Sequence, residues 1–398
     1  MKDFKQVYLD NNATTALAPE VIDEMLPFFR EHYGNPSSTY SFGSRVRDML
    51  EKARALVAAS INALPEEIIF TSCGTESDNT AIYSALEAYP GRRHIITTVV
   101  EHPAVLNFCR QMETRGYSVT YLKVDAHGKL DMESFADALG NDTAIVSIMY
   151  ANNETGIVFP IEDIGRLIDS RNCPGGRILF HTDAVQAVGK VAVDVKKLNV
   201  DMLSLSGHKL HAPKGVGALY VRKGTPFYPY LIGGHQENGR RSGTENAASI
   251  AGLGKACELA GASLNEEAAY LRQLRDKLET AVISSCPGAI VNGRGTERLP
   301  NTSSISFEYI DGEAILMFLD SNGIYAASGS ACSSGSGKPS HVLEAMSIPS
   351  SAIHGSIRFS LSRYNDASDI ERLINVLPDV IKKLREISPL SGSFKCAH

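Results

Sequence analysis

Several features are missing from this 398-residue sequence, and each absence excludes a class of protein. The formal net charge is -6 at pH 7, so the chain has no basic excess with which to bind a nucleic-acid backbone or an anionic membrane surface. The start of the chain lacks the apolar core of a signal peptide, and no apolar run approaches the roughly 18–20 residues that cross a bilayer. We therefore expect a cytoplasmic protein that binds neither nucleic acid nor membrane.

Cysteine is scarce and carries no pairing pattern. The seven cysteines are widely scattered, and no two form the CxxC pair that is typical of zinc or iron–sulfur ligation. An odd number of scattered cysteines in a cytoplasmic protein predicts reduced thiols, of which one or two at most are reactive. The sequence therefore predicts neither a metal site nor a disulfide framework.

Short apolar runs alternate with helical patterns through the first two thirds of the chain. The runs have the length and composition of buried strands and cover residues 68–70, 94–100, 143–149, 177–181, 201–205 and 216–221. Between them lie helical patterns, such as the one in which Val46, Leu50, Ala53 and Val57 share a face. This alternation predicts the α/β class, with a mostly parallel sheet covered by helices.

A change of pattern near a patch of small residues, 261–263, divides the chain. Beyond it, apolar segments at 303–307 and 356–361 and helical patterns at 314–319 and 369–387 favour a smaller α+β unit. We predict a large domain of residues 15–261 and a small domain formed by residues 1–14 and 262–398. The small domain contains a stretch of glycine, serine and alanine around Cys332, and such a composition predicts a mobile loop.

A possible anion site lies in the segment FTSCGTES at 70–77. It is an apolar strand that passes through Gly74 and Thr75 into a helix, and a helix start offers free N–H groups and a positive dipole end to a phosphate. An ordinary N-cap by Thr75 explains the segment equally well. The segment matches neither a Walker loop nor the GxGxxG motif, which argues against a mononucleotide-binding or dinucleotide-binding site.

Two further segments place reactive side chains at strand ends. Asp183, in HTDAVQ, would sit where open α/β sheets bind ligands and could keep a ring nitrogen protonated, although a lone Asp there is more often a helix cap. Lys209, in SGHK, could condense with a carbonyl group, although a single lysine is more often a surface residue. Together, an anion site, an acid and an amine are what pyridoxal phosphate requires. Their order along the chain favours that cofactor over three unrelated roles.

The sequence resembles the cysteine desulfurases of the class V aminotransferase family, the NifS and IscS group, nearly from end to end. The resemblance rests on long ordered segments: YLDNNATT, GNPSS, FTSCGTESDN, TTVVEHPAVL, ANNETG, HTDAVQAVGK, SGHKLHAPKGVG, GGHQENGRRSGTENAASI, GSACSSGS and IRFSLSRYN. It implies a pyridoxal-phosphate transferase of fold type I, with a seven-stranded large domain and a smaller α+β domain. The implied reaction converts L-cysteine to L-alanine and leaves sulfur on an enzyme cysteine for iron–sulfur cluster assembly of the nitrogenase type.

The resemblance also assigns roles around the cofactor ring. It implies that Lys209 forms the Schiff base and that Asp183 holds the ring nitrogen. Gln186 would contact the ring hydroxyl, Asn153 would lie near that hydroxyl and the substrate carboxylate, and His102 would stack on the ring and move protons.

Other residues would bind the cofactor phosphate and the substrate. The resemblance implies phosphate binding by Gly74, Thr75, Ser206 and His208, joined by Thr244 from a neighbouring subunit of an obligate homodimer. Arg358 would bind the substrate carboxylate through its two-pronged guanidinium.

Cys332 would accept the sulfur and pass it to an iron–sulfur scaffold protein. The loop departs from the family pattern at Ser333 and at 338–339, which should affect loop charge and partner contacts more than chemistry. Three alternatives remain: a selenocysteine lyase or cysteine-sulfinate desulfinase, another pyridoxal-phosphate enzyme of the same fold such as a transaminase, and a non-catalytic sulfur carrier. A mobile thiol argues against the first two, and the complete set of Lys209, Asp183 and Arg358 argues against the third.

Overall fold

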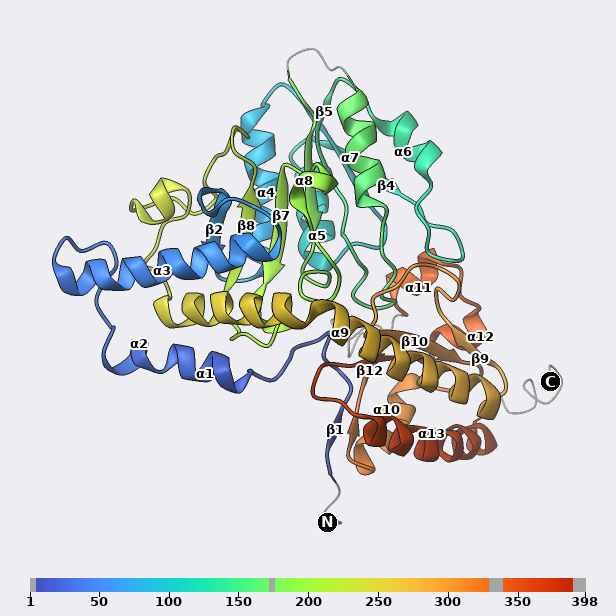
Figure 1. Ribbon diagram of the computed structural model, residues 1–398. Coiled ribbons are helices and arrows are strands. Elements are labelled where there is room, and N and C mark those ends of the chain that lie inside the picture. Colours follow the sequence, from blue (N-terminus) through green and yellow to red (C-terminus); the bar gives the residue numbers. More distant parts are fainter. Residues whose placement is uncertain (1–4, 172–175, 329–338, 389–398) are drawn as a thin grey trace.

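A sheet of seven strands dominates the computed structural model, which describes residues 5–171, 176–328 and 339–388 (Figure 1). In spatial order the strands are β2 (Ile68–Thr71), β8 (Gly217–Val221), β7 (Met202–Ser206), β6 (Leu179–Asp183), β5 (Thr143–Ser147), β3 (His94–Thr98) and β4 (Ser118–Leu122). Neighbouring strands pair in parallel except at β8, which is antiparallel to both β2 and β7. The predicted α/β class with a mostly parallel sheet is confirmed.

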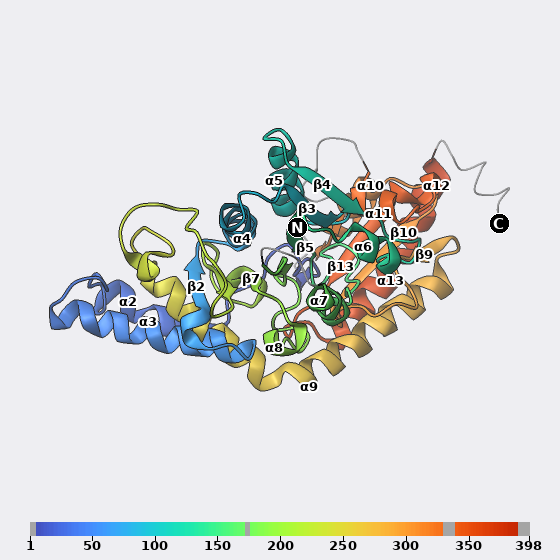
Figure 2. The same ribbon diagram turned by 90° about the horizontal axis from the view of Figure 1, so that it is seen from above.

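Helices cover both faces of this sheet (Figure 2). Successive strand residues point to opposite faces, so Ile68 and Phe70 join one apolar cluster while Ile69 joins another. The first cluster contains side chains from α3 (Ser41–Ser60), α7 (Ile161–Ser170) and α8 (Val195–Leu198), and the second contains side chains from α4 (Gly74–Ala88) and α5 (Pro103–Glu113). Because both faces are buried, the strands are continuous apolar runs rather than alternating ones.

A third apolar cluster lies beside a smaller antiparallel sheet. Its strands, in spatial order, are β12 (Ala327–Ser328), β13 (Ser356–Ser360), β10 (Thr302–Phe307) and β9 (Ala289–Val291). The cluster also contains side chains from α10 (Gly312–Ser321) and α13 (Ala367–Ile387). The N-terminal strand β1 (Val7–Tyr8) pairs with β11 (Ile324–Tyr325) and adds Val7 and Leu9 to this cluster. Residues from both ends of the chain therefore build this region.

One helix, α9 (Ala247–Ser285), contributes to one apolar cluster of the large sheet and to the cluster of the small sheet. Leu253 and Cys257 pack into the cluster of the large sheet, whereas Leu271 and Leu278 pack into the cluster of the small sheet. The helix runs without interruption through residue 261, where the sequence predicts a domain boundary. The division into residues 15–261 and the rest remains our proposal.

The remaining elements are short. They are α1 (Pro19–Met25), α2 (Pro27–Arg30), α6 (Met132–Ala138), α11 (His341–Ala345), α12 (Ser350–Ile353) and three 3-10 turns, η1 (Pro65–Glu67), η2 (Gly207–Lys209) and η3 (Gln236–Gly239). Among the described residues, no helix is both long and apolar enough to cross a membrane.

Candidate active site

Most of the predicted site residues line one cavity of about 420 Å³. Asp183 and Ser206 are the last residues of β6 and β7, so the cavity lies at the carboxyl ends of these strands, where open α/β sheets bind ligands. The predicted residues that line it are Gly74, Thr75, His102, Asn153, Asp183, Gln186, Ser206, His208, Lys209 and Arg358. Segments that are far apart in the sequence therefore meet in one place.

The start of helix α4 provides an anion site in this cavity. Its N-cap residue, Cys73, makes no side-chain capping hydrogen bond, and Thr75 lies inside the first turn rather than at the cap. A side chain at Gly74 would approach Val185 Cγ2 to 2.8 Å, so glycine allows the helix start to pack closely against the loop after β6. The buried hydroxyl of Ser206 lies beside this turn and has no hydrogen-bond partner. Free helix N–H groups and an unpaired buried hydroxyl suit a phosphate.

Asp183 is a buried carboxylate that faces the cavity. Its Oδ1 accepts a hydrogen bond from the backbone N–H of Val185 at 2.9 Å, which is the local turn-capping contact that the sequence also allowed. Burial raises the pKa of Asp183, and the nearby His102 and Lys209 partly offset that rise. A cationic group in the cavity would stabilise the ionised carboxylate further.

The amine of Lys209 reaches the N-terminal segment from the 3-10 turn after β7. Its Nζ donates hydrogen bonds to the backbone oxygen of Asn12 at 2.6 Å and to that of Ala13 at 2.7 Å. The side chain lines the large cavity and also a smaller one beside it. The amine is therefore held at the wall of the site rather than in bulk solvent.

His102 caps helix α5. Its Nδ1 accepts a hydrogen bond from the N–H of Ala104 at 3.2 Å, so the neutral ring carries its proton on Nε2. Burial lowers the pKa of His102, with Asp183 opposing that change. The neutral ring can thus donate from Nε2 but has no free nitrogen that accepts a proton while the cap is in place.

Arg358 reaches the cavity from β13 of the small sheet. Its guanidinium donates to Asp10 Oδ1 at 2.7 Å and to the backbone oxygen of Asn153 at 3.1 Å. The residue is 3% exposed, and its Nε atom is buried without a partner. A planar guanidinium with an unsatisfied N–H is suited to bind a carboxylate.

Two predicted residues are not part of this cavity. Thr244 is exposed and does not line it, so the prediction that Thr244 serves the site of a second subunit stays a prediction. Cys332 lies outside the described residues. Within those residues, no group of His, Cys, Asp and Glu side chains could hold a metal ion.

The prediction missed Asn12, which connects the site to the rest of the fold. Its backbone oxygen accepts from Lys209 and from Gln186 Nε2 at 3.0 Å, and its side-chain nitrogen donates to the backbone oxygen of Asn153 at 3.2 Å and to Thr302 Oγ1 at 2.9 Å. Asn12 belongs to the segment YLDNNATT, and two adjacent asparagines at the end of a short strand are the only local signal. Nothing in that segment indicates which distant residues it contacts.

Comparisons with known proteins agree over nearly the whole chain. The class-V aminotransferase family model matches residues 7–373. A cysteine desulfurase, NifS, of Azotobacter vinelandii is 56% identical over 96% of this chain and 94% of that protein, and a cysteine desulfurase of Trichormus azollae is 55% identical over 97% and 95%. A solved structure described as a NifS-like protein has a TM-score of 0.89 at 39% identity and covers 96% of this chain and 100% of that one. The chain therefore belongs to the class-V aminotransferase family of pyridoxal-phosphate enzymes, among its cysteine desulfurases.

Proposed function

We propose that this enzyme converts L-cysteine to L-alanine in the 420 Å³ cavity and transfers the sulfur to Cys332 as a persulfide. The observation that carries the proposal is the convergence of a helix start, a buried carboxylate, an amine and a guanidinium on one cavity. The similarity to NifS of Azotobacter vinelandii supports iron–sulfur cluster assembly of the nitrogenase type as the use of that sulfur. An iron–sulfur scaffold protein would be the acceptor, and the cytoplasm would be the location.

The residues of the cavity fit pyridoxal phosphate. The start of α4 and the unpaired hydroxyl of Ser206 would hold its phosphate, and the carboxylate of Asp183 would hold its ring nitrogen in the protonated state. When bound, this cofactor supplies an electron-withdrawing ring that stabilises negative charge at the α-carbon of the substrate. Asp183 serves that chemistry because a protonated ring nitrogen withdraws electrons more strongly.

Lys209 and Arg358 both line the cavity and would act on the substrate together. The guanidinium of Arg358 would bind the substrate carboxylate, with Asn153 beside it, and so would orient the α-carbon. The Lys209 amine would carry the α-proton. The backbone oxygens of Asn12 and Ala13 stabilise this amine in its charged state, because both accept hydrogen bonds from Nζ.

His102 would act on the substrate through its neutral ring. With Nδ1 engaged by the N–H of Ala104, the ring offers the N–H of Nε2 as a hydrogen-bond donor. To take a proton from a substrate thiol, Nδ1 would first have to release the N–H of Ala104. This requirement refines the role that the resemblance implies for His102.

The transfer of sulfur balances without an added oxidant or reductant. The thiolate of Cys332 forms a bond to the substrate sulfur, and the bond between that sulfur and Cβ breaks. The electron pair of the broken bond stays on carbon, which gains a proton and becomes the methyl group of alanine. Two of the other thiols are less suited: burial raises the pKa of both Cys109 and Cys257 to about 12, and a thiolate is the reactive form.

Mass spectrometry of the enzyme after reaction with cysteine tests this function. We expect an added mass of about 32 Da, one sulfur atom, on the peptide that holds Cys332. Cys332→Ala should bind the cofactor normally yet form almost no alanine, and Cys73→Ala is the matched control because Cys73 lines the cavity. Alanine formation without any persulfide would instead indicate a lyase, and a persulfide confined to another cysteine would refute the role of Cys332.

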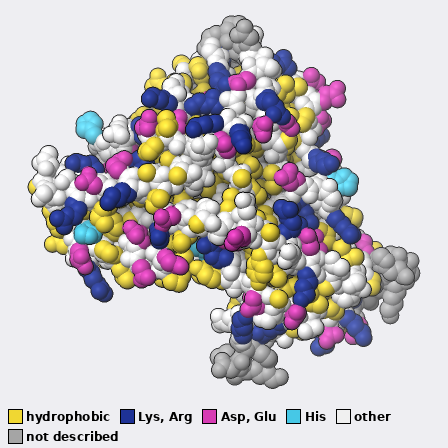
Figure 3. Space-filling view, in the orientation of Figure 1, with side chains coloured by type: hydrophobic (Ala, Val, Ile, Leu, Met, Phe, Trp, Pro, Cys, Tyr) yellow, Lys and Arg dark blue, Asp and Glu magenta, His cyan; other side chains and the backbone are white. Residues whose placement is uncertain are grey.

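We further propose that the enzyme forms a homodimer. Large apolar side chains stay exposed near α1–α3 and in the loop after β8, among them Phe29 at 67%, Tyr33 at 73% and Ile232 at 82%. Figure 3 shows hydrophobic surface on the side where α1–α3 lie. An exposed apolar surface of this kind is typical of a protein interface.

Thr244 provides the test of a shared site. If it reaches the phosphate site of a second subunit, Thr244→Ala should weaken cofactor binding by about 1.5–3 kcal/mol, the value of one hydrogen bond to a charged group. Titration of the apoprotein with pyridoxal phosphate measures the loss, and sedimentation shows whether the dimer persists. A stable monomer that binds the cofactor tightly would contradict the dimer.

A further inference from the structure

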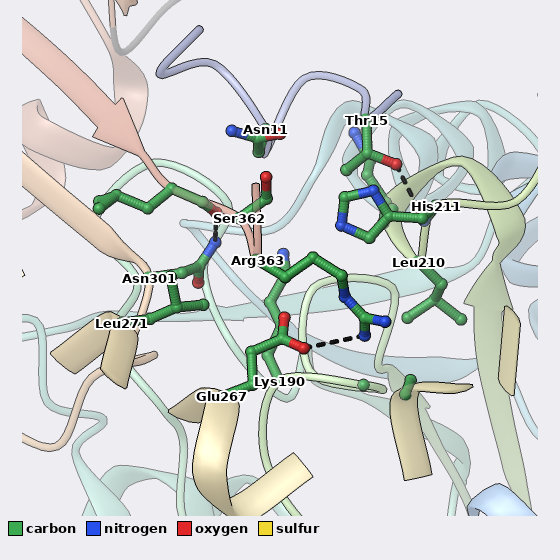
Figure 4. A pocket seen from close by; sticks show the side chains of 14 residues that line it. Asn11, Thr15, Lys190, Leu210, His211, Glu267, Leu271, Asn301, Ser362 and Arg363 are labelled. Carbon is green, nitrogen blue, oxygen red and sulfur yellow. Dashed lines mark hydrogen bonds and ion pairs between the residues drawn. The ribbon is translucent and has the colours of Figure 1, made fainter. Parts of the chain in front are cut away.

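A second lysine lies beside Lys209 and has no role in the mechanism above. Lys190 follows a turn in which Gly189 adopts a φ of 77°, a conformation that glycine reaches without strain. It lines a smaller cavity of about 20 Å³, which has room for about one water molecule (Figure 4). Lys209 lines this small cavity as well as the large one. The two amines therefore lie on neighbouring walls of the site.

The Lys190 amine binds the two amide side chains that surround the site. Its Nζ donates to Gln186 Oε1 at 2.6 Å and to Asn12 Oδ1 at 3.2 Å. Lysine Nζ has N–H groups to donate, and here both of its amide partners turn their oxygens toward it. The orientation of both amide groups is thus determined by the chemistry of one side chain.

For Gln186 the consequence concerns the large cavity. Its oxygen faces Lys190, and its Nε2 donates one hydrogen to the backbone oxygen of Asn12 at 3.0 Å. An amide nitrogen carries two hydrogens, and Gln186 lines the large cavity, so its second N–H remains for a ligand there. A flipped amide would instead bring its nitrogen against the Lys190 ammonium and its oxygen against the carbonyl of Asn12.

For Asn12 the consequence concerns the substrate side. Its Oδ1 accepts from Lys190 and from Asn301 Nδ2 at 3.2 Å. Its Nδ2 is then free to donate to the backbone oxygen of Asn153, which also accepts from Arg358. Through its two hydrogen bonds, Lys190 therefore contacts Gln186, which lines the large cavity, and Asn12, which lies next to Asn153 on the substrate side.

The charge of Lys190 is held in an unfavourable place. Burial, together with the positive charges of Lys209 and Arg358, lowers its pKa well below the usual value, and Glu267 opposes this only in part. Glu267 itself pairs with Arg363 at 2.9 Å. Buried lysines whose pKa is strongly lowered are enriched at functional sites.

We propose that Lys190 is a positioning residue that holds the amides of Gln186 and Asn12 so that an N–H of Gln186 faces the cofactor. This inference rests on the proposed function, because it takes pyridoxal phosphate as the ligand of the large cavity. It adds to that function a residue that acts on the cofactor through a second side chain.

The test measures binding of pyridoxal phosphate to the full-length apoprotein. Lys190→Met keeps an unbranched side chain, one atom shorter than lysine, but removes every side-chain N–H donor. We expect the Kd for the cofactor to rise about three- to tenfold, as for one lost hydrogen bond, and the pH midpoint of the cofactor's visible absorbance to shift. Lys190→Gln, which retains a donor on a shorter side chain, should recover part of both effects. The melting temperature of the apoprotein should change little.

A double-variant cycle shows whether Lys190 acts through Gln186. In a Gln186→Met background, Lys190→Met should cause at most half of the change in Kd that it causes alone, because the amide that it positions is absent. Lys214→Met is the matched control for the loss of one positive charge near the site, and it should leave the Kd and the midpoint unchanged.

Three outcomes would overturn the inference. In the first, Lys190→Met binds the cofactor with the Kd and the absorbance midpoint of the parent enzyme. In the second, the full effect persists in the Gln186→Met background. In the third, Lys214→Met matches Lys190→Met. Failure of the parent enzyme to bind pyridoxal phosphate would instead refute the proposed function.

Discussion

The two sheets bury polar side chains of different kinds. At the carboxyl ends of the large sheet the buried groups include ionisable ones: burial raises the pKa of Glu101 to about 8 and also raises the pKa of Asp183. In the small sheet, apart from Arg358, the buried polar groups are uncharged amides and hydroxyls. Asn292 donates to Ser304 and Ser306 at 2.9 Å, and the hydroxyls of Ser306 and Ser356 lie 2.6 Å apart.

This contrast separates groups that support chemistry from groups that support the fold. An ionisable side chain taken out of water destabilises the folded state unless it neutralises, so a cluster of such groups marks a functional site. A hydrogen-bonded neutral network costs little and fixes how the strands pair. The small sheet nevertheless contributes to the site, because β13 carries Arg358.

The largest expected effect is on the chemistry of the large sheet. Lys209→Ala should abolish the visible absorbance of the bound cofactor and reduce alanine formation by at least about 10³-fold, since the variant has no amine to carry the α-proton. The fold should persist, because Lys209 lies at a cavity wall and not in an apolar cluster. Circular dichroism and a cysteine assay measure the two properties. Normal alanine production would refute the assignment.

An intermediate effect is expected in the small sheet, on stability alone. Asn292→Ala removes two donated hydrogen bonds and leaves the buried hydroxyl of Ser304 without its Asn292 partner, so the free energy of unfolding should fall by about 2–4 kcal/mol. The kcat/KM for cysteine should stay unchanged. Denaturant titration and steady-state kinetics test both statements, and a parallel loss of activity would show that the two regions are not separate.

The smallest effect should appear as a pH dependence at Glu101. Its pKa is raised from 4.5 to about 8, so the folded state retains a proton that the unfolded state releases, and this group's contribution to stability falls as pH rises across that range. Glu101→Gln cannot ionise, so the variant should gain stability relative to the parent as the pH rises from about 5 to about 9. The slope of unfolding free energy against pH is the measurement. Equal slopes would mean that Glu101 is ionised in the folded enzyme.

The sequence predicted the strands of the large sheet better than their arrangement. Each predicted run corresponds to a strand, because strands buried on both faces are uniformly apolar. The edge strand β4 was missed, since its residues are only half-buried and include Ser118, Thr120 and Tyr121. The antiparallel direction of β8 has no sequence signal, because periodicity does not depend on chain direction.

Sequence motifs identified the reactive side chains but not the residues that form hydrogen bonds with them. Asp183 and Lys209 follow strands, so their neighbourhood is encoded locally. Asn12 and Lys190 lie 178 positions apart and meet only through the tertiary fold. No local pattern distinguishes Lys190 from a surface lysine, and a contact between two such residues becomes visible only in three dimensions.

The shared helix α9 has a consequence for how the molecule unfolds. With 39 residues it is about 58 Å long, and each half packs into a different apolar cluster. If one cluster melted first, half of α9 would be left as a solvated peptide, and short helices are marginal in water. The free energy that holds each half therefore depends on the other half. The two regions should lose their structure in one cooperative transition, and a destabilising change in either should lower the melting temperature of both.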